Sequence, residues 1–384
     1  MVKPVKLSNW SRILAGQVHC VATVALSIAL SGGLFLQSLQ AQEAAAKTTL
    51  ITLGTQGGPV PNRIRSQPAI AIVVNDQPYL IDAGNGVMRQ LVLAGIAPNK
   101  IRQIFITHLH DDHDADLGSF MGFNWSVGVS KPITVYGPKG IGEFLAGFER
   151  SFAINEAIRR KDFPDFYKID LKDLFQHVEI EASSKRGVMI YKDQNIEVDA
   201  IENCHYHYGS DAPSIGGASY AFRFKTADKT IVLSGDTGPC DALAEFARGA
   251  DILVHEVINV DLVLASLTGA GVVPPERISY IRRHMEADHS TPEIVGKLAE
   301  KAGVGMVVLT HLVPGDEADP VGAYTDGVSR FFKGQVVAAS AWRVFDGKRD
   351  SCRTNPASAE IRDVSSRGPG RAVRERFNTG SSLI

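Results

Sequence analysis

The chain has 384 residues, of which 44% are hydrophobic and 21% charged. This balance excludes a largely disordered or collagen-like chain and is typical of a folded protein of enzyme size. The 40 Lys and Arg residues nearly match the 42 Asp and Glu residues, so no net field favours nucleic acid or an anionic membrane. Four cysteines without a C-x-x-C pair predict neither a disulfide scaffold nor a thiolate zinc site.

The first 41 residues have the pattern of an export signal. Basic residues up to Arg12 precede an uncharged apolar run at 20–36, and small or polar residues at 39–41 suit a cleavage site. We expect a signal peptide over residues 1–41, and hence an exported protein, periplasmic or secreted. Because the apolar run has 17 residues, an N-terminal membrane anchor is the alternative. With the leader cleaved, we expect no stable membrane association.

Short apolar runs between turn residues predict the strands. In chain order, we expect strands at 48–53, 69–74, 79–81, 102–107, 132–136, 196–201, 218–224, 230–234, 252–254 and 305–310. Helices are expected at 86–94, with Asn85 as the N-cap, and at 140–152, 154–160, 241–248 and 292–302. No clear period emerges from 162 to 184. Strands and helices mixed along the chain predict an α/β or α+β sandwich.

The chain after the leader is expected to form one domain and a tail. The alternating elements fill residues 48–340, which we expect to be a single folded domain. Residues 346–384 lose the apolar periodicity and are rich in Arg, Ser, Gly and Pro, which predicts a flexible tail.

A polar cluster follows the expected strand at 102–107. It reads His108-Leu109-His110-Asp111-Asp112-His113. Residues i and i+2 of an extended segment point the same way, so His108 and His110 can bind one ion together. As the chain turns, Asp112 and His113 can face a second ion. Such a cluster is costly to bury without a metal, because every polar group needs a partner.

Three further ligand-type residues each follow an expected strand. They are His205, Asp236 and His311. Residues at strand ends form the rim where sites on layered folds are built. A carboxylate such as Asp236 can bridge two cations, and two metals can activate a water between them. His207 is the alternative to His205, which the motif context favours.

Together these residues resemble the dinuclear site of the metallo-β-lactamase superfamily, whose fold is an αββα sandwich. The resemblance extends from about Thr48 to Val337 and is most similar to the branch that holds ribonuclease Z, arylsulfatases and related phosphodiesterases. The supporting motifs are Leu53-Gly54-Thr55, Ile81-Asp82-Ala83-Gly84, Tyr136-Gly137-Pro138, Ser234-Gly235-Asp236-Thr237, His289-Ser290-Thr291 and Leu309-Thr310-His311.

The resemblance implies a role for each site residue. One metal would be bound by His108, His110 and His205, the other by Asp112, His113 and His311, with Asp236 bridging. Asp82 would orient a ligand imidazole. Asp112 would orient or deprotonate the attacking water, and His289 would protonate the leaving group. Two divalent ions are implied, with zinc preferred and manganese or iron also suited to His and carboxylate ligands.

The substrate expectation rests on departures from the family pattern. Ribonuclease Z carries a long tRNA-clamping arm between the ligands matching His205 and Asp236, and here only residues 206–235 separate them. Without that arm and with a near-neutral chain, we expect a small-molecule ester substrate and no specific nucleic acid. True β-lactamases of this superfamily generally lack the bridging Asp, so by resemblance Asp236 favours phosphate or sulfate esters, or a lactone, over a β-lactam. A lactone or β-lactam hydrolase and a non-catalytic metal-binding protein are the alternatives, and a homodimer is left open.

Several other residues have open interpretations. Cys204 and Cys240 lie near expected ligands, and two buried free thiols are favoured over a disulfide. For Arg63 and Arg65 two interpretations are equally favoured: contact with an anionic substrate, or a place in a solvated loop. The remaining histidines are interpreted as structural or surface residues: His255 at the rim, His284 on a surface helix or the pocket wall, and His177 on the surface.

Overall fold

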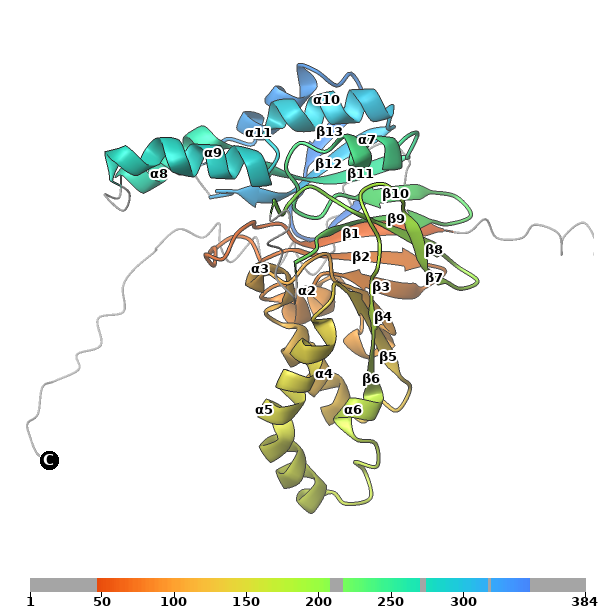
Figure 1. Cartoon of the computed structure of the whole chain (residues 1–384). Helices are drawn as coiled ribbons and strands as arrows, with labels where there is room; N and C mark the ends of the chain where they lie inside the picture. Colours follow the sequence, from red (N-terminus) through yellow and green to blue (C-terminus); the bar gives the residue numbers. More distant parts are fainter. Residues whose placement is uncertain (1–46, 208–216, 270–273, 317–318, 346–384) are drawn as a thin grey trace, which may run out of the picture. The chain divides into compact units, whose positions relative to one another are not determined.

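The computed structural model describes residues 47–207, 217–269, 274–316 and 319–345 (Figure 1). The signal peptide expected over residues 1–41 and the tail expected over residues 346–384 lie outside the described residues. Within these four ranges, no helix combines the length and the apolar character needed to cross a lipid bilayer.

The first of two mixed sheets is built from the N-terminal half of the described chain and its last strand. Antiparallel pairs join β14 to β1, β1 to β2 and β2 to β3, and parallel pairs join the strands from β3 to β6. In spatial order the strands are β14 (Arg343–Phe345), β1 (Thr48–Gly54), β2 (Ala69–Val74), β3 (Gln77–Ile81), β4 (Gln103–Phe105), β5 (Ile133–Gly137) and β6 (Phe175–Glu179).

The second sheet is built from the C-terminal half. Its strands from β7 to β10 pair antiparallel and those from β10 to β13 parallel. In spatial order they are β13 (Gln335–Ala338), β12 (Met306–Val313), β11 (Ile252–Ile258), β10 (Thr230–Leu233), β9 (Tyr220–Lys225), β8 (Glu197–Glu202) and β7 (Val188–Lys192).

Helices follow the strands of each sheet, and several of them pack on its outer face. Those following strands of the first sheet are α2 (Val87–Leu93), η1 (Pro98–Lys100), α3 (Asp111–Asp114), α4 (Leu117–Ser126), α5 (Ile141–Asp162) and α6 (Leu171–Leu174). Those following strands of the second are α7 (Asp241–Phe246), α8 (Val260–Gly269), η3 (Pro275–Arg277), α9 (Ile278–Asp288), α10 (Pro292–Ala302) and α11 (Gly322–Ser329). The expected αββα sandwich is confirmed.

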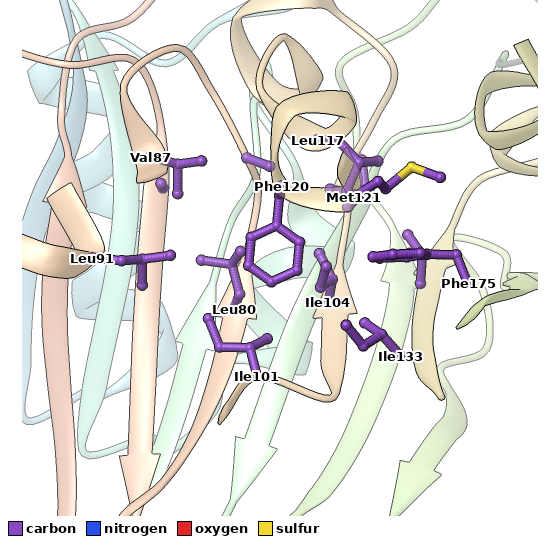
Figure 2. Packing of buried hydrophobic residues seen from close by; sticks show 14 of the residues in the cluster. Leu80, Val87, Leu91, Ile101, Ile104, Leu117, Phe120, Met121, Ile133 and Phe175 are labelled. Atoms are coloured by element: carbon purple, nitrogen blue, oxygen red, sulfur yellow. The ribbon is translucent and has the colours of Figure 1, made fainter. Parts of the chain in front are cut away.

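Strand β4 shows how the layers are held together. Successive side chains of a strand point to opposite faces. Ile104 packs with Leu80 and with Phe120 of α4 in the outer cluster (Figure 2). Its neighbour Phe105 faces the second sheet, where its ring centroid lies 5.3 Å from that of Phe224. Both faces of β4 are therefore buried, which fixes the strand end from which the His-rich segment leaves.

Some expected elements differ from those in the structure. The N-cap of α2 is Gly86 rather than Asn85, because its φ of 93° suits a residue without Cβ. One continuous helix, α5, replaces the two helices expected at 140–152 and 154–160, since no Gly or Pro interrupts it there. Helix α4 has seven of its ten residues buried, which hides the helical period that sequence analysis looks for. The other elements not expected from sequence are β6, β7, β13, β14, η1, α3, α6, α8, η3, α9 and α11.

Candidate metal centre

The His-rich segment leaves the end of β4 as expected. His108 Nε2 and His110 Nδ1 lie 3.0 Å apart, which agrees with two side chains at i and i+2 of an extended segment. His110 has extended backbone angles and precedes the one-turn helix α3. That turn brings Asp112 and His113 to the other side of the cluster, where His113 Nε2 is 3.6 Å from Asp112 Oδ2.

Two loops and one strand of the second sheet complete the cluster. His205 follows β8, and its Nε2 lies 3.3 Å from His110 Nδ1. The peptide oxygen of Asp288 holds the other ring nitrogen of His205 at 2.9 Å. Asp236 follows β10, and its two carboxylate oxygens lie 3.2 Å from His113 Nε2 and 3.0 Å from His311 Nε2.

His311 enters the cluster through a β-bulge. The pairing of β11 with β12 shifts register between Glu256 and Val257, and His311 is the additional residue opposite them. Its φ is 45°, in the left-handed region that non-glycine residues rarely adopt. A bulge turns a side chain away from the regular strand direction. The loop after β1 approaches His311 closely, since a Cβ on Gly57 would lie 2.3 Å from His311 Nδ1.

The side chains assemble into two groups that share one carboxylate. In each group, one candidate ligand atom per residue lies within 4.8 Å of the others. The groups are His108, His110, His205 and Asp236, and Asp112, His113, Asp236 and His311. All seven residues are buried except His110, which is exposed and therefore marks the side open to solvent. The structure thus brings together every ligand expected from sequence.

Asp82 anchors the imidazole of His113. Its Oδ2 lies 2.8 Å from His113 Nδ1, and its Oδ1 accepts a 2.8 Å hydrogen bond from the Thr107 backbone N–H. A carboxylate in this position fixes the ring so that the opposite nitrogen, Nε2, faces the cluster. Asp82 therefore lies where it was expected, behind one candidate ligand.

The charges of the cluster are strongly coupled. Burial opposes ionisation of Asp112, but the nearby His113 and His311 outweigh it and lower the pKa of Asp112 to about 2. Burial likewise opposes protonation of His311, but Asp236 and Asp112 outweigh it and raise the pKa of His311 to about 10. Burial and the charge of His113 lower the pKa of His108 well below its ordinary value. Without metal, protons on His311 and His113 thus balance the two carboxylates.

This donor set fits divalent metal ions. Imidazole nitrogens and carboxylate oxygens are the ligands that zinc, manganese and iron share. Among the described residues, His113 Nε2, Asp236 Oδ1 and His311 Nδ1 are buried without a hydrogen-bond partner. A buried polar atom without a partner costs folding free energy. A cation between the two groups would give His113 Nε2 and Asp236 Oδ1 a partner.

Glu256 is a site residue that sequence analysis missed. It is 1% exposed, and its Oε1 accepts hydrogen bonds from the backbone N–H of Thr237 at 2.8 Å and from His289 Nδ1 at 3.0 Å. His289 is 22% exposed, and its ring centroid lies 5.1 Å from that of His205. The one available signal was a lone acidic residue inside the fully buried strand β11.

Cys204 and Cys240 form a disulfide, so the expectation of two free thiols is wrong. The bridge connects the loop that carries His205 to the loop that carries Asp236. Two hydrogen bonds reinforce it, because the Cys204 N–H donates to Thr237 Oγ1 and the Cys204 C=O accepts from Gly238 N–H. The disulfide was the less favoured alternative from sequence, because the choice depends on how two loops of the second sheet approach each other.

The remaining histidines and Arg65 are not among the candidate metal ligands. His207 is exposed, with Nε2 2.9 Å from the Ala287 C=O, so the geometry favours His205 as the ligand. His284 is 67% exposed on α9 and pairs with Asp288, and His177 is exposed on β6. His255 is buried, with Nδ1 2.8 Å from the Glu256 C=O. Arg65 is half-buried and bound to three neighbours, so it is a wall residue rather than part of a solvated loop.

Comparisons with known proteins agree with this architecture. Residues 78–312 match the model of a Beta-lactamase superfamily domain. The chain is 32% identical over 275 residues to ribonuclease Z from Mycobacterium sp. (strain KMS), which covers 70% of this chain and 87% of that protein. The structure is similar to human tRNase Z, short form, with a TM-score of 0.54, 21% identity and coverage of 77% of this chain and 98% of that one. It is also similar to the metallo-β-lactamase fold protein YhfI from Bacillus subtilis, with a TM-score of 0.53, 19% identity and coverage of 78% and 98%.

These relatives correct the substrate expectation. We expected a small-molecule ester and no nucleic acid, and the similarity to ribonuclease Z contradicts this. The expectation relied on the near-neutral charge of the whole chain and on the short segment between His205 and Asp236. Neither quantity measures the local contacts that hold an RNA phosphate, because a few arginines near a site provide them whatever the net charge.

Proposed function

We propose a function from one premise: the chain belongs to the metallo-β-lactamase superfamily and is a hydrolase. We infer that it is a metal-dependent phosphodiesterase that cleaves RNA. The observation that carries this proposal is the buried pair of His and Asp groups that share Asp236. The 32% identity with ribonuclease Z supports RNA as the substrate.

In this proposal the two groups hold two divalent ions. His108, His110 and His205 would hold one, Asp112, His113 and His311 the other, and Asp236 both. Ions bound there would lower the pKa of a water molecule and offset the negative charge that builds up on the phosphate. Zinc is the preferred metal for such a site, and manganese and iron suit the same donors.

Asp112 would orient the attacking water rather than take its proton. With its pKa lowered to about 2, the carboxylate is ionised at neutral pH and is a weak base. It is also held in place, because the Gly58 backbone N–H donates to Asp112 Oδ2 at 2.8 Å. An ionised, fixed carboxylate accepts a hydrogen bond from water and aligns it with the phosphorus.

His289 would donate a proton to the leaving oxygen. Burial lowers the pKa of His289, but the charge of Glu256 and its hydrogen bond outweigh burial, so the pKa is raised. A carboxylate only accepts hydrogen bonds, so Nδ1–H of His289 donates to Glu256 and Nε2–H stays available for the substrate. The pair therefore favours the protonated form of the His289 imidazole beside the cluster.

The substrate is tested by comparing hydrolysis rates on one preparation of the full-length chain. The panel contains a 5′-labelled oligoribonucleotide, the DNA oligomer of the same sequence, bis(p-nitrophenyl) phosphate, p-nitrophenyl sulfate, an acyl lactone and nitrocefin. We expect RNA cleavage that the variant His110→Ala abolishes. Preference for sulfate, lactone or nitrocefin would overturn the RNA assignment. Metal binding without turnover of any substrate would overturn the hydrolase proposal and indicate a non-catalytic metal-binding protein.

We also propose that the protein is exported. The disulfide between Cys204 and Cys240 supports an oxidising compartment, since disulfides persist outside the reducing cytosol. Residues 1–41 would be the signal peptide and residues 48–340 the hydrolase domain, followed by a tail at 346–384. N-terminal sequencing of protein recovered from a fractionated producing cell tests this. A mature chain that starts after residue 41 is expected, and an uncleaved chain in the cytosol would contradict export.

A further inference from the structure

A second pocket lies beside the loop between β1 and β2. It has a volume of about 360 Å³ and is lined by that loop, by α2 and by the turn before β14. Of the ten described residues that line it, three are arginines and none is acidic. The lining residues are Asn62, Arg63, Ile64, Arg65, Ser66, Arg89, Gln90, Ser340, Ala341 and Trp342.

The arginines give the pocket the character of a phosphate site. Arg63 and Arg89 are exposed at the pocket, and Arg89 forms no ion pair with a described residue. A guanidinium presents a planar set of N–H donors that matches phosphate oxygens. Asp316 Oδ1 accepts a 3.1 Å hydrogen bond from the lining residue Asn62, and the three arginines outnumber this carboxylate, so the described part of the pocket favours an anion.

The wall of the pocket is fixed by its own hydrogen bonds. Arg65 Nε donates to the Gly315 C=O at 3.1 Å, and Arg65 Nη1 donates to Thr55 Oγ1 at 2.9 Å and to the Ala339 C=O at 3.1 Å. These bonds tie the β1–β2 loop to the second sheet. A wall that is already ordered spends less conformational entropy when a ligand binds.

Trp342 adds a strained aromatic residue to this wall. Its φ of 61° is in the left-handed region, and its backbone N–H donates to the Thr52 C=O at 2.7 Å. Strained backbone conformations concentrate at ligand sites. Trp342 Nε1 and Gln90 Oε1 are buried and have no partner among the described residues, as polar atoms next to a water or ligand site often are.

The same loop connects this pocket to the metal centre. Gly58 donates its backbone N–H to Asp112 Oδ2, and Arg63 follows five residues later. Five residues span at most about 18 Å when fully extended. The separation of the two sites along this loop is therefore on the scale of a few nucleotides of an RNA strand.

We propose that the pocket of Arg63, Arg65, Arg89 and Trp342 binds a phosphate of the RNA strand a few nucleotides from the scissile bond. This inference rests on the proposed function, since it names how the same substrate is held. The contact would be to the backbone, so it would add affinity and register without reading sequence. The pocket would also provide a local basic surface for RNA, although the net charge of the whole chain is close to zero.

Binding is tested apart from cleavage. A 5′-fluorescein single-stranded oligoribonucleotide is titrated with the full-length chain in EDTA, and anisotropy gives Kd at several salt concentrations. The test variant is Arg63→Ala/Arg89→Ala. The control Arg248→Ala/Arg330→Ala removes the same charge from exposed positions elsewhere. Arg89→Glu is a second test variant, and circular dichroism checks that each variant is folded.

We expect the test variant to weaken RNA binding about tenfold or more, and the control less than twofold. The slope of log K against log salt should flatten by roughly 0.7 for each RNA phosphate that the variant no longer neutralises. With metal restored, RNA cleavage at low RNA concentration should fall at least fivefold more than hydrolysis of bis(p-nitrophenyl) phosphate, which is too small to span both sites.

The outcomes separate this inference from the proposed function. Equal RNA affinity for the test and control variants would overturn the pocket, even if the wild type cleaves RNA. A wild-type chain that binds no RNA would overturn it as well. In a parallel titration with inorganic phosphate, loss of phosphate binding in the test variant without loss of RNA binding would assign the pocket to free phosphate and contradict the inference. RNA binding that depends on Arg63 and Arg89 but leads to no cleavage would overturn only the proposed function.

Discussion

Glu256 Oε1 accepts a 3.0 Å hydrogen bond from His289 Nδ1, and the pair lies at the edge of the metal centre. The carboxylate is buried and the imidazole is partly exposed. Because the ion pair favours the protonated imidazole, Glu256 decides the charge of a side chain that the substrate can reach. This hydrogen bond therefore supports the proposed role of His289 as the proton donor to the leaving group.

Glu256→Gln should lower the pKa of His289 and so weaken proton donation. The pKa of His289 is raised in the folded chain, so its proton is lost as pH rises, and the alkaline limb of the kcat profile should move to lower pH. We expect RNA cleavage at pH 8 to fall about 10- to 100-fold. Bis(p-nitrophenyl) phosphate, whose leaving group needs no proton, should lose much less. Equal losses for both substrates would show that Glu256 acts through structure alone.

Asp236→Asn should uncouple the two ligand groups. The amide cannot serve as a charged ligand to both, and it leaves His113 and His311 without their shared carboxylate. Metal content should fall, and RNA cleavage should drop at least about a thousandfold, which is a loss of about 4 kcal/mol of transition-state stabilisation. Elemental analysis and rate measurements check this against Asp326→Asn, an exposed control. Wild-type metal content in Asp236→Asn would contradict the bridging role.

Metal binding should release protons, because His311 is protonated in the metal-free chain. Its pKa of about 10 means that the imidazole must lose a proton before it can coordinate. Calorimetry in buffers of different ionisation enthalpy should show net proton release at pH 7 and an affinity that rises with pH. The same raised pKa stabilises the metal-free fold fully below about pH 6.5, and this stabilisation is lost as pH rises through about 10. Binding without proton release would be inconsistent with this charge arrangement.

Reduction of the Cys204–Cys240 bridge should loosen two loops of the metal centre. The bridge spans 36 residues, and loss of such a bridge typically costs about 2–4 kcal/mol of unfolding free energy. Cys204→Ser/Cys240→Ser should therefore unfold at lower denaturant concentration and bind metal more weakly. Cys352→Ser, outside the described residues, is the control. Unchanged metal affinity in the double variant would limit the bridge to a role in stability.

The ligands predictable from sequence are those whose geometry is local or lies at a strand end. His108 and His110 share a side because alternate residues of an extended segment do so, and His205 and Asp236 follow strands that the apolar pattern reveals. Glu256 was not predictable, because its contact with His289 depends on how the chain after α9 returns to β11. Long-range placement of this kind leaves no periodic signal.

Two other features show the same limit. His311 was expected after a strand, and the structure places it within β12 at a bulge, which one additional residue creates without altering composition. The arginine pocket combines residues of the β1–β2 loop, α2 and the turn before β14, so the net charge of the chain gave no hint of it. Net charge averages over the whole surface, whereas recognition depends on local groups.

The most direct test of the central claim is a metal titration of RNA cleavage. The full-length chain is stripped with chelator, its residual metal is measured by elemental analysis, and Zn²⁺ is then added in known ratios while the cleavage rate is followed. We predict no cleavage in the stripped chain and full activity at about two Zn²⁺ per chain. Full RNA cleavage by the stripped chain, or a rate that does not respond to added Zn²⁺, would contradict the account.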